Sequence, residues 1–227
     1  MPEPVSEVIT IDGPAGVGKS TISRKLAARL GYTYLDTGAM YRAVALYLAD
    51  RNIDFTDEDA VERALGDITI ELLPAIDETA DSDVLLNGVD VGSRIRTPEM
   101  SMRASSVSAL PSVRRKLTEM QQGLGRRGRV VAEGRDTGTV VFPTARHKFY
   151  LDASAIVRTR RRALQMLTRG ETVDEEALLQ MTVTRDRQDK ERAVAPLKKA
   201  VDAHLIDTTN RSIDQVLQAI LTTIYPE

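Results

Sequence analysis

The sequence predicts an α/β protein with a parallel β-sheet at its core and helices on both faces of the sheet. Short β-branched or apolar runs, interrupted by Gly, Pro or Asp, alternate with longer segments whose apolar residues recur every three or four positions. Parallel strands need crossover connections, which are usually helices, so this alternation favours a parallel sheet. A chain of 227 residues is long enough for one such domain with an insertion.

The first strand and the first helix are the clearest elements. Residues 8–11 are Val-Ile-Thr-Ile and are followed at once by Asp-Gly-Pro, which is typical of a buried strand. Apolar residues then recur at a spacing of four through residues 19–30, and Gly31 is expected to cap the end of this helix. A further strand and two further helices are expected at residues 34–35, 39–51 and 56–65, with Thr56 as the cap of the last.

The pattern changes between about residues 67 and 96. Residues 68–72 are expected to form a strand, and an acidic, irregular loop follows at residues 74–83. Residues 84–91 then place Asn87-Gly88 between two short apolar runs, which is the strongest short-range signal for a type I′ hairpin. We therefore expect a small antiparallel insertion in an otherwise βα chain.

The second half of the chain returns to alternating strands and helices. Pro111 is expected to separate two helices at residues 99–109 and 112–122. A closing helix begins at Ser212, where Gln215 completes a capping box. The other expected elements are strands at residues 130–133, 148–152 and 205–207 and charged helices at residues 153–169 and 174–188.

Composition excludes several classes of protein. The chain has no cysteine, which rules out disulfides and thiolate metal sites, and its two histidines lack metal-ligand spacing. The net charge of −2 and the 4% of aromatic residues argue against wholesale binding to nucleic acid. No apolar run approaches the ~20 residues of a membrane span, and residues 1–4 lack the features of a signal peptide. We expect a cytoplasmic monomer that binds neither nucleic acid nor membrane.

A phosphate-binding motif follows the first strand. The sequence GPAGVGKS fits the pattern G-x-x-x-x-G-K-[ST] of the P-loop, and it lies between a strand and a helix as this motif requires. Its glycines let backbone N–H groups converge on phosphate oxygens. Lys19 would reach the β- and γ-phosphates of ATP, and the Ser20 hydroxyl would bind Mg²⁺. The residues expected to hold ATP are Gly13, Pro14, Ala15, Gly16, Val17, Gly18, Lys19, Ser20 and Thr21.

The P-loop alone does not choose between an ATPase, a GTPase and a small-molecule kinase, but four further segments carry a resemblance. They are LDTGAMYR at residues 35–42, ASSV at 104–107 with Arg114, EGRDTGT at 133–139, and the stretch at 185–196 that ends in RAVAP. With IDGP at residues 11–14, they make nearly the whole chain resemble the bacterial cytidylate kinases. The GRD-x-GTVVFP and RAVAPL stretches are not general features of P-loop proteins.

This resemblance implies the fold of a nucleoside monophosphate kinase that uses ATP and Mg²⁺ to phosphorylate CMP and dCMP. The implied parts are a core at about 1–66, 97–152 and 190–227, a monophosphate-binding insertion at about 67–96 and a helical lid at about 153–189. The implied catalytic residues are Lys19, Arg135, Arg158, Arg162 and Arg192. The implied substrate-binding residues are Asp36, Thr37, Tyr41, Arg42, Ser105, Arg114, Arg135, Asp136, Arg185, Asp189 and Arg192. At position 37 the family more often has Ser, and the hydroxyl is retained here.

These residue types suit phosphoryl transfer to a cytosine nucleotide. Arginine grips phosphate oxygens in a planar, bidentate way. A carboxylate such as Asp136 can accept a hydrogen bond from the N4 amine of cytosine, while Arg114 donates to the base acceptors. Uracil has a carbonyl in place of the amine, so we expect discrimination against UMP. Glu133 ends an apolar strand, where P-loop kinases commonly hold a carboxylate near Mg²⁺.

Each assignment has a simpler alternative. Asp136 could cap a turn, Arg185 and Asp189 could form an i, i+4 ion pair, and the lid arginines could lie on a solvated helix. A P-loop kinase for UMP or shikimate is the nearest alternative function. An NTP-binding switch is a second alternative, although no Asn-Lys-x-Asp guanine motif follows the P-loop.

Overall fold

The computed structural model describes residues 7–73, 83–126 and 128–226. Five parallel strands form the larger sheet, in the order β2-β6-β1-β7-β8. These strands are β1 (Val8–Asp12), β2 (Thr33–Asp36), β6 (Val130–Gly134), β7 (His147–Asp152) and β8 (His204–Asp207). Because all five run in the same direction, their carboxyl ends lie along one edge of the sheet, and the prediction of a parallel core is confirmed.

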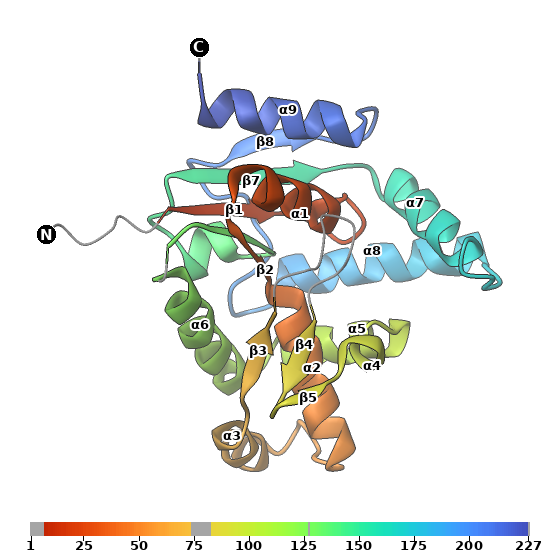
Figure 1. Cartoon of the computed structure of the whole chain (residues 1–227). Coiled ribbons are helices and arrows are strands. Elements are labelled where there is room, and N and C mark those ends of the chain that lie inside the picture. The colour runs from red at the N-terminus through yellow and green to blue at the C-terminus, as the bar shows by residue number, and fades with distance from the viewer. Residues whose placement is uncertain (1–6, 74–82, 127, 227) are drawn as a thin grey trace, which may run out of the picture.

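Helices cover both faces of this sheet (Figure 1). On one face, α1 (Lys19–Leu30) and α9 (Ile213–Ile224) pack against Ile9, Ile11 and Val131. On the other face, α2 (Thr37–Asp50), α5 (Pro98–Val107) and α6 (Pro111–Gly125) pack with Val130 and Ala132. Neighbouring residues of β6 thus point to opposite faces, as the two-residue period of a strand requires.

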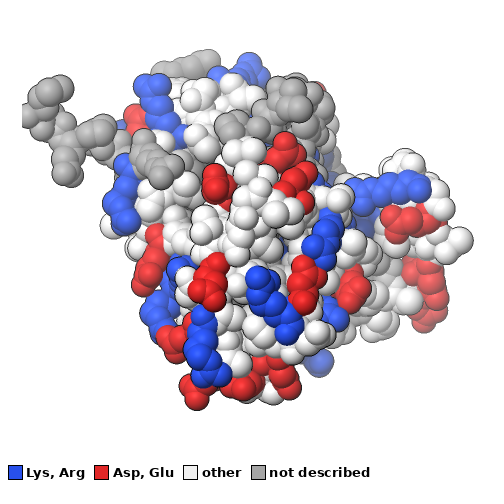
Figure 2. Space-filling model, turned by 60° about the horizontal axis from the view of Figure 1, so that its bottom comes forward, with Lys and Arg blue, Asp and Glu red and all other residues white. Residues whose placement is uncertain are grey.

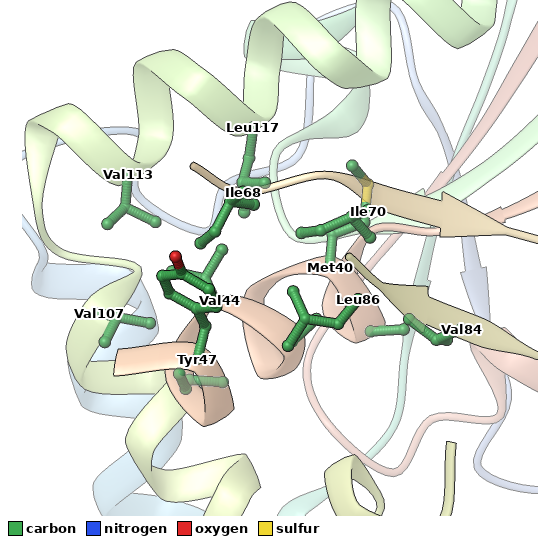
Figure 3. Packing of buried hydrophobic residues seen from close by; sticks show 14 of the residues in the cluster. Met40, Val44, Tyr47, Ile68, Ile70, Val84, Leu86, Val107, Val113 and Leu117 are labelled. Carbon is green, nitrogen blue, oxygen red and sulfur yellow. The ribbon is translucent and has the colours of Figure 1, made fainter. Parts of the chain in front are cut away.

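The antiparallel insertion is confirmed and shares a core with the rest of the chain. Its strands are β3 (Ile70–Leu72), β4 (Val84–Leu86) and β5 (Val89–Asp90), and Asn87 and Gly88 both have positive φ, as a type I′ turn requires. In Figure 3, apolar side chains of this small sheet meet those of α2, α5 and α6. The acidic loop expected at 74–83 lies outside the described residues except for Asp83.

The remaining helices are α3 (Glu58–Gly66), α4 (Gly92–Ile95), α7 (Ala155–Leu167) and α8 (Glu175–Glu191). The expectation that Thr56 caps α3 is wrong. The cap is Asp57, whose Oδ1 accepts a hydrogen bond from the backbone nitrogen of Ala60 at 2.9 Å. Pro111 separates α5 from α6 as expected, and it is itself the first residue of α6.

Two short helices were not expected from the sequence. One is α4, and the other is the π-helix η1 (Thr137–Val141), which follows β6 directly. None of the helices in the described part of the chain is long and apolar enough to cross a membrane. On the face of the molecule shown in Figure 2, acidic and basic side chains are interspersed.

Candidate active site

The P-loop leaves the carboxyl end of β1 in a conformation that depends on glycine. Gly13 has a φ of 148°, and a Cβ there would overlap the carbonyl oxygen of Leu151 in β7. Gly18, with a φ of 96°, is the N-cap of α1 and carries no side chain that could cover the helix N-terminus. The backbone amides at the start of α1 therefore remain available to an anion.

A cavity of about 250 Å³ lies in front of this loop. It is lined by parts of the P-loop, the start of α2, one side of α5, the end of β6 and the inner side of α7 and α8. The expected site residues that line it are Ala15, Gly16, Lys19, Ser20, Asp36, Thr37, Tyr41, Arg42, Ser105, Arg135, Asp136, Arg162, Arg185, Asp189 and Arg192. The expected site residues that are not part of its lining are Gly13, Pro14, Val17, Gly18, Thr21, Arg114 and Arg158.

Lys19 is buried at the phosphate-binding end of the cavity, with 7% of its surface exposed. Its Nζ donates a hydrogen bond to the Pro14 carbonyl at 2.8 Å, so the side chain folds back over its own loop. Burial, followed by the charge of Arg135, lowers the pKa of Lys19 to about 7. An anion placed here would supply the negative charge that this ammonium lacks.

Glu133 lies at the end of β6 between Lys19 and the start of α2. Its Oε1 accepts a hydrogen bond from the Tyr34 hydroxyl, whereas its buried Oε2 finds no partner within the described residues. Burial and the nearby charge of Asp36 raise the pKa of Glu133, and Lys19 opposes this shift. The Ser20 side chain also lowers this pKa, so the cavity contains a buried carboxylate beside Ser20.

The start of α2 holds its polar side chains in place through local contacts. Asp36 caps the helix by accepting from the Ala39 nitrogen at 2.8 Å, and its second oxygen accepts from Arg42 Nη2 at 3.1 Å. The Thr37 hydroxyl donates to the Glu133 carbonyl at 2.7 Å. The Nε of Arg42 is buried and finds no partner within the described residues. Asp36 therefore fixes the position of the Arg42 guanidinium at the cavity wall, while Thr37 ties the start of α2 to β6.

The buried carboxylate of Asp136 also lines the cavity and is paired with two arginines. Asp136 accepts a hydrogen bond from Arg114 and a longer one, at 3.4 Å, from Arg192 Nη2. Arg114 also donates to the Ser108 carbonyl at 3.1 Å, and its guanidinium lies 5.7 Å from the centre of the Tyr41 ring. The Asp136 side chain makes no cap hydrogen bond to η1. The alternative that Asp136 serves as a turn cap is therefore wrong.

Asp189 on α8 forms a second pair of a carboxylate and an arginine, with Arg135 from the segment that follows β6. Arg135 Nε donates to Asp189 Oδ2 at 2.8 Å. Burial would raise the pKa of Asp189, but the charge and hydrogen bond of Arg135 outweigh it and the pKa is lowered. Burial and the charge of Arg135 lower the pKa of Arg185 to about 10. The ion-pair partner of Asp189 is therefore Arg135, from another element, rather than Arg185 at i−4.

Arg158 and Arg162, which were expected to belong to a lid, lie on the same face of α7 and have different surroundings. Arg158 is 4% exposed and donates to the Ala15 carbonyl at 3.0 Å and to both carboxylate oxygens of Asp186. Arg162, one turn further along, lines the cavity. Arg161 points elsewhere and donates to the Thr208 carbonyl at 2.6 Å. Arg158 thus joins α7, α8 and the P-loop, and Arg162 faces the space where substrate would lie.

Residues of α5 that line the cavity were only partly expected. Besides Ser105, the lining includes Ser101 and Ala104 of α5 and Ser108, the residue that follows this helix. Their spacing of three and four places small side chains along one face of a helix, and this periodicity was the signal in the sequence. Asp12, at the end of β1, was also missed as a separate residue, and its contacts are described below.

A P-loop at the carboxyl edge of a parallel sheet, facing buried arginines from other elements, defines a P-loop phosphotransferase. The model of the family described as cytidylate kinase matches residues 9–225. The cytidylate kinase of Carboxydothermus hydrogenoformans is 47% identical over 216 residues, which cover 95% of this chain and 96% of that protein. That of Syntrophotalea carbinolica is 46% identical, with 96% and 91% covered. The chain belongs to the cytidylate kinase family.

Two further similarities each concern either part of a longer protein or the fold alone. The bifunctional pantoate ligase/cytidylate kinase of Synechococcus elongatus is 47% identical over 94% of this chain and 41% of that protein. A crystal structure of an uncharacterized protein from Eubacterium ventriosum has a TM-score of 0.51 at 12% identity, covering 98% of this chain and all of that one. This second likeness shows the fold alone. Family membership makes the chain an enzyme, a nucleotide-binding kinase with ATP as its phosphoryl donor.

Proposed function

We propose that this chain transfers the γ-phosphoryl group of ATP to CMP and dCMP by direct in-line displacement. The observation that carries the proposal is that P-loop residues and Asp136, which is paired with Arg114, line the same cavity. We refer to these two parts of the lining as its phosphate end and its base end. Groups suited to binding phosphate and a group suited to binding a base thus line one space of about 250 Å³. Kinases for shikimate or UMP are not favoured, because the family is that of cytidylate kinase.

Magnesium fits the phosphate end of the cavity. Magnesium prefers oxygen ligands and usually binds one or two protein groups together with phosphate oxygens and waters. The Ser20 hydroxyl and the unpartnered Glu133 Oε2 offer such oxygens. No three His, Asp or Glu side chains in the described parts of the chain form a metal site of their own. When bound, Mg²⁺ would neutralise charge on the ATP phosphates. Ser20 would then be its protein ligand, with Glu133 near its coordination shell.

Positioned cations supply the rest of the transfer chemistry. Lys19 would contact the β- and γ-phosphates of ATP, and Arg42 would hold the phosphate of the acceptor nucleotide. Arg135, Arg162 and Arg192 would approach the phosphoryl group in transit. Such donors stabilise a transition state because they are already oriented before the charge develops. The acceptor phosphate is itself the nucleophile, so the proposed reaction needs no covalent intermediate.

The base and the sugar would be read at the other end. Asp136 would accept a hydrogen bond from the cytosine N4 amine, while Arg114 and Ser105 contact the remaining polar edge. Asp136 already receives two arginines, which keep its carboxylate fixed. Arg185 and Asp189 would bind the sugar. A buried mismatch between the carboxylate and the O4 carbonyl of uracil costs about 1–3 kcal/mol, which is roughly 5- to 150-fold in kcat/KM.

The test is an ADP-release assay with ATP and Mg²⁺ against CMP, dCMP, UMP and AMP. We expect efficient turnover of CMP and dCMP and weak turnover of UMP. Asp136→Asn should lower the CMP:UMP ratio of kcat/KM by about tenfold, since an amide can donate to uracil O4. The control is Asp57→Asn, because Asn caps a helix as well as Asp and this residue lies outside the cavity lining.

Two outcomes would contradict the proposal. ADP release that does not depend on any monophosphate would indicate an ATPase or a switch. Equal use of CMP and UMP by the unmodified protein would leave a pyrimidine kinase but refute the reading of the N4 amine by Asp136.

A further inference from the structure

Asp12 connects the phosphate-binding side of the site to the base-binding side. It is the last residue of β1, directly before the P-loop, and is buried with 4% of its surface exposed. Its Oδ1 accepts from the Thr137 nitrogen at 2.9 Å and from the Thr137 hydroxyl at 2.8 Å. Its Oδ2 accepts from the Gly138 nitrogen at 2.8 Å. All three donors belong to the first turn of the π-helix η1.

A helix usually receives such hydrogen bonds from its own N-cap residue. The N-cap of η1 is Asp136, and an Asp at this position normally accepts from the amides of the first turn. The Asp136 side chain makes no such bond here and instead meets Arg114 and Arg192. Asp12 therefore satisfies the helix N-terminus from another strand.

We infer that Asp12 is a positioning residue for base specificity: by capping η1 in place of Asp136, it leaves the Asp136 carboxylate available to the acceptor base. This inference rests on the proposed function, in which Asp136 reads the cytosine amine. Asp12 itself touches no substrate in this scheme. Its effect passes through the two hydrogen-bonded residues that follow Asp136 in the chain.

The close fit between β1 and η1 supports this role. A Cβ on Gly138 would lie 2.8 Å from Thr10 Oγ1 and 3.4 Å from Asp12 Oδ2. A Cβ on Gly134 would lie 2.7 Å from the Thr37 hydroxyl and from Thr137 Cγ2. The chain on either side of Arg135–Asp136 is therefore packed against fixed partners. Because Asp12 accepts from the N–H groups of Thr137 and Gly138, the donors that remain for Asp136 are the two arginines.

Asp12→Asn tests the inference because it keeps the size of the side chain. One carboxylate oxygen becomes an NH₂ group, so one donor of η1 meets another donor and is left without an acceptor. The adjacent carboxylate of Asp136 can accept a hydrogen bond from this backbone N–H of η1. To do so, it would have to give up its contacts with Arg114 and Arg192. We expect the CMP:UMP ratio of kcat/KM to fall by about tenfold, mainly through a higher KM for CMP.

Thr10→Val is the matched control. Thr10 lies on the same strand, is buried and approaches the same glycine of η1, but its hydroxyl finds no hydrogen-bond partner within the described residues. Removing an unpartnered hydroxyl at constant shape should leave the CMP:UMP ratio unchanged. If the contact between β1 and η1 served only to hold the fold together, Asp12→Asn and Thr10→Val would change the CMP:UMP ratio alike.

A double-mutant cycle distinguishes the role of Asp12 from the recognition of the base by Asp136. It compares Asp12→Asn, Asp136→Asn and the double variant. The inference is supported if Asp12→Asn lowers the ratio and adds nothing in the presence of Asp136→Asn. It is overturned if Asp136→Asn lowers the ratio while Asp12→Asn does not, in which case the proposed function stands. If neither variant lowers the CMP:UMP ratio, the proposal that Asp136 recognises the cytosine amine is itself wrong. Should Asp12→Asn fail to fold, Thr137→Val, which removes the hydroxyl bond only, carries the same outcomes with a smaller fall.

Discussion

Binding of ATP at pH 8 should draw close to one proton from solution onto Lys19. The pKa of this buried lysine is lowered to about 7 by burial and by the charges of Arg135 and Arg185. At pH 8, one unit above this pKa, about one tenth of the unliganded protein carries the charged ammonium. At pH 6 about nine tenths of it does. The protonation state of Lys19 therefore differs between the two conditions before the nucleotide arrives.

Phosphate oxygens beside Lys19 favour the charged form and move its pKa back toward the ordinary value of 10.5. Because binding raises the pKa, protons are taken up on binding and not released. The expected uptake is about 0.9 proton per ATP at pH 8 and about 0.1 at pH 6. By the same linkage, the affinity for ATP should fall as the pH rises above 7, by up to about tenfold per pH unit.

Calorimetric titration with Mg-ATP in two buffers of different ionisation enthalpy measures this uptake. Lys19→Arg is the control, because a guanidinium stays charged at both pH values while protons from other groups still contribute. The difference between the two proteins at pH 8 is the contribution of Lys19. A difference below roughly 0.2 proton, or an equal uptake in Lys19→Arg, would refute the reasoning.

Two matched pairs of substitutions test the packing of α6 and the two lid arginines. Gly125→Ala should lower the free energy of unfolding by about 1–3 kcal/mol, because its Cβ would overlap the Phe142 ring. Gly123→Ala, on the same helix and 3.6 Å or more from its neighbours, should raise it by about 0.5–1 kcal/mol. Thermal unfolding measures both, and shifts of equal sign would contradict the packing. Arg158→Met should lower the melting temperature because a buried ion pair loses one partner, at a cost of up to about 3–5 kcal/mol. Arg162→Met should lower kcat by at least about tenfold at an unchanged melting temperature, and the opposite pattern would exchange the two roles.

The parts of the structure that the residues alone predicted are those that depend on local sequence, whereas the acceptor-site residues, Asp136 and Arg114 among them, were expected only from the resemblance to a family. The P-loop needs a strand, a glycine-rich turn and a helix in immediate succession, and all three lie within residues 8–30. The hairpin at residues 84–91 is equally local, because Asn87 and Gly88 can both adopt positive φ. In each case the residues that specify the conformation are neighbours in the chain.

The parts that were not predicted depend on contacts between distant segments. Asp136 has the sequence position of a cap, and only Asp12, on another strand, relieves it of that task. Arg158 and Arg162 are equivalent by helical spacing, and the difference between them comes from Asp186 on α8. The cap of α3 was misassigned for a simpler reason, since Thr56 and Asp57 are adjacent residues that both suit a cap.

The two ends of the cavity differ in how far the protein satisfies its own charges. At the base end, Arg114 and Arg192 are both paired with Asp136. At the phosphate end, the Nε atom of Arg42 is buried without a partner in the described residues, and the pKa of Lys19 is lowered by burial and by the charges of Arg135 and Arg185. Buried cations that repel one another are unfavourable for folding, and phosphate groups that bind them offset this cost. Lys19 and Arg42 are the cations that the proposed function assigns to the phosphates of the two nucleotides, between which negative charge would move. Under the proposed function, the base end would therefore fix which nucleotide binds, and the phosphate end would keep its electrostatic attraction for the group that is transferred.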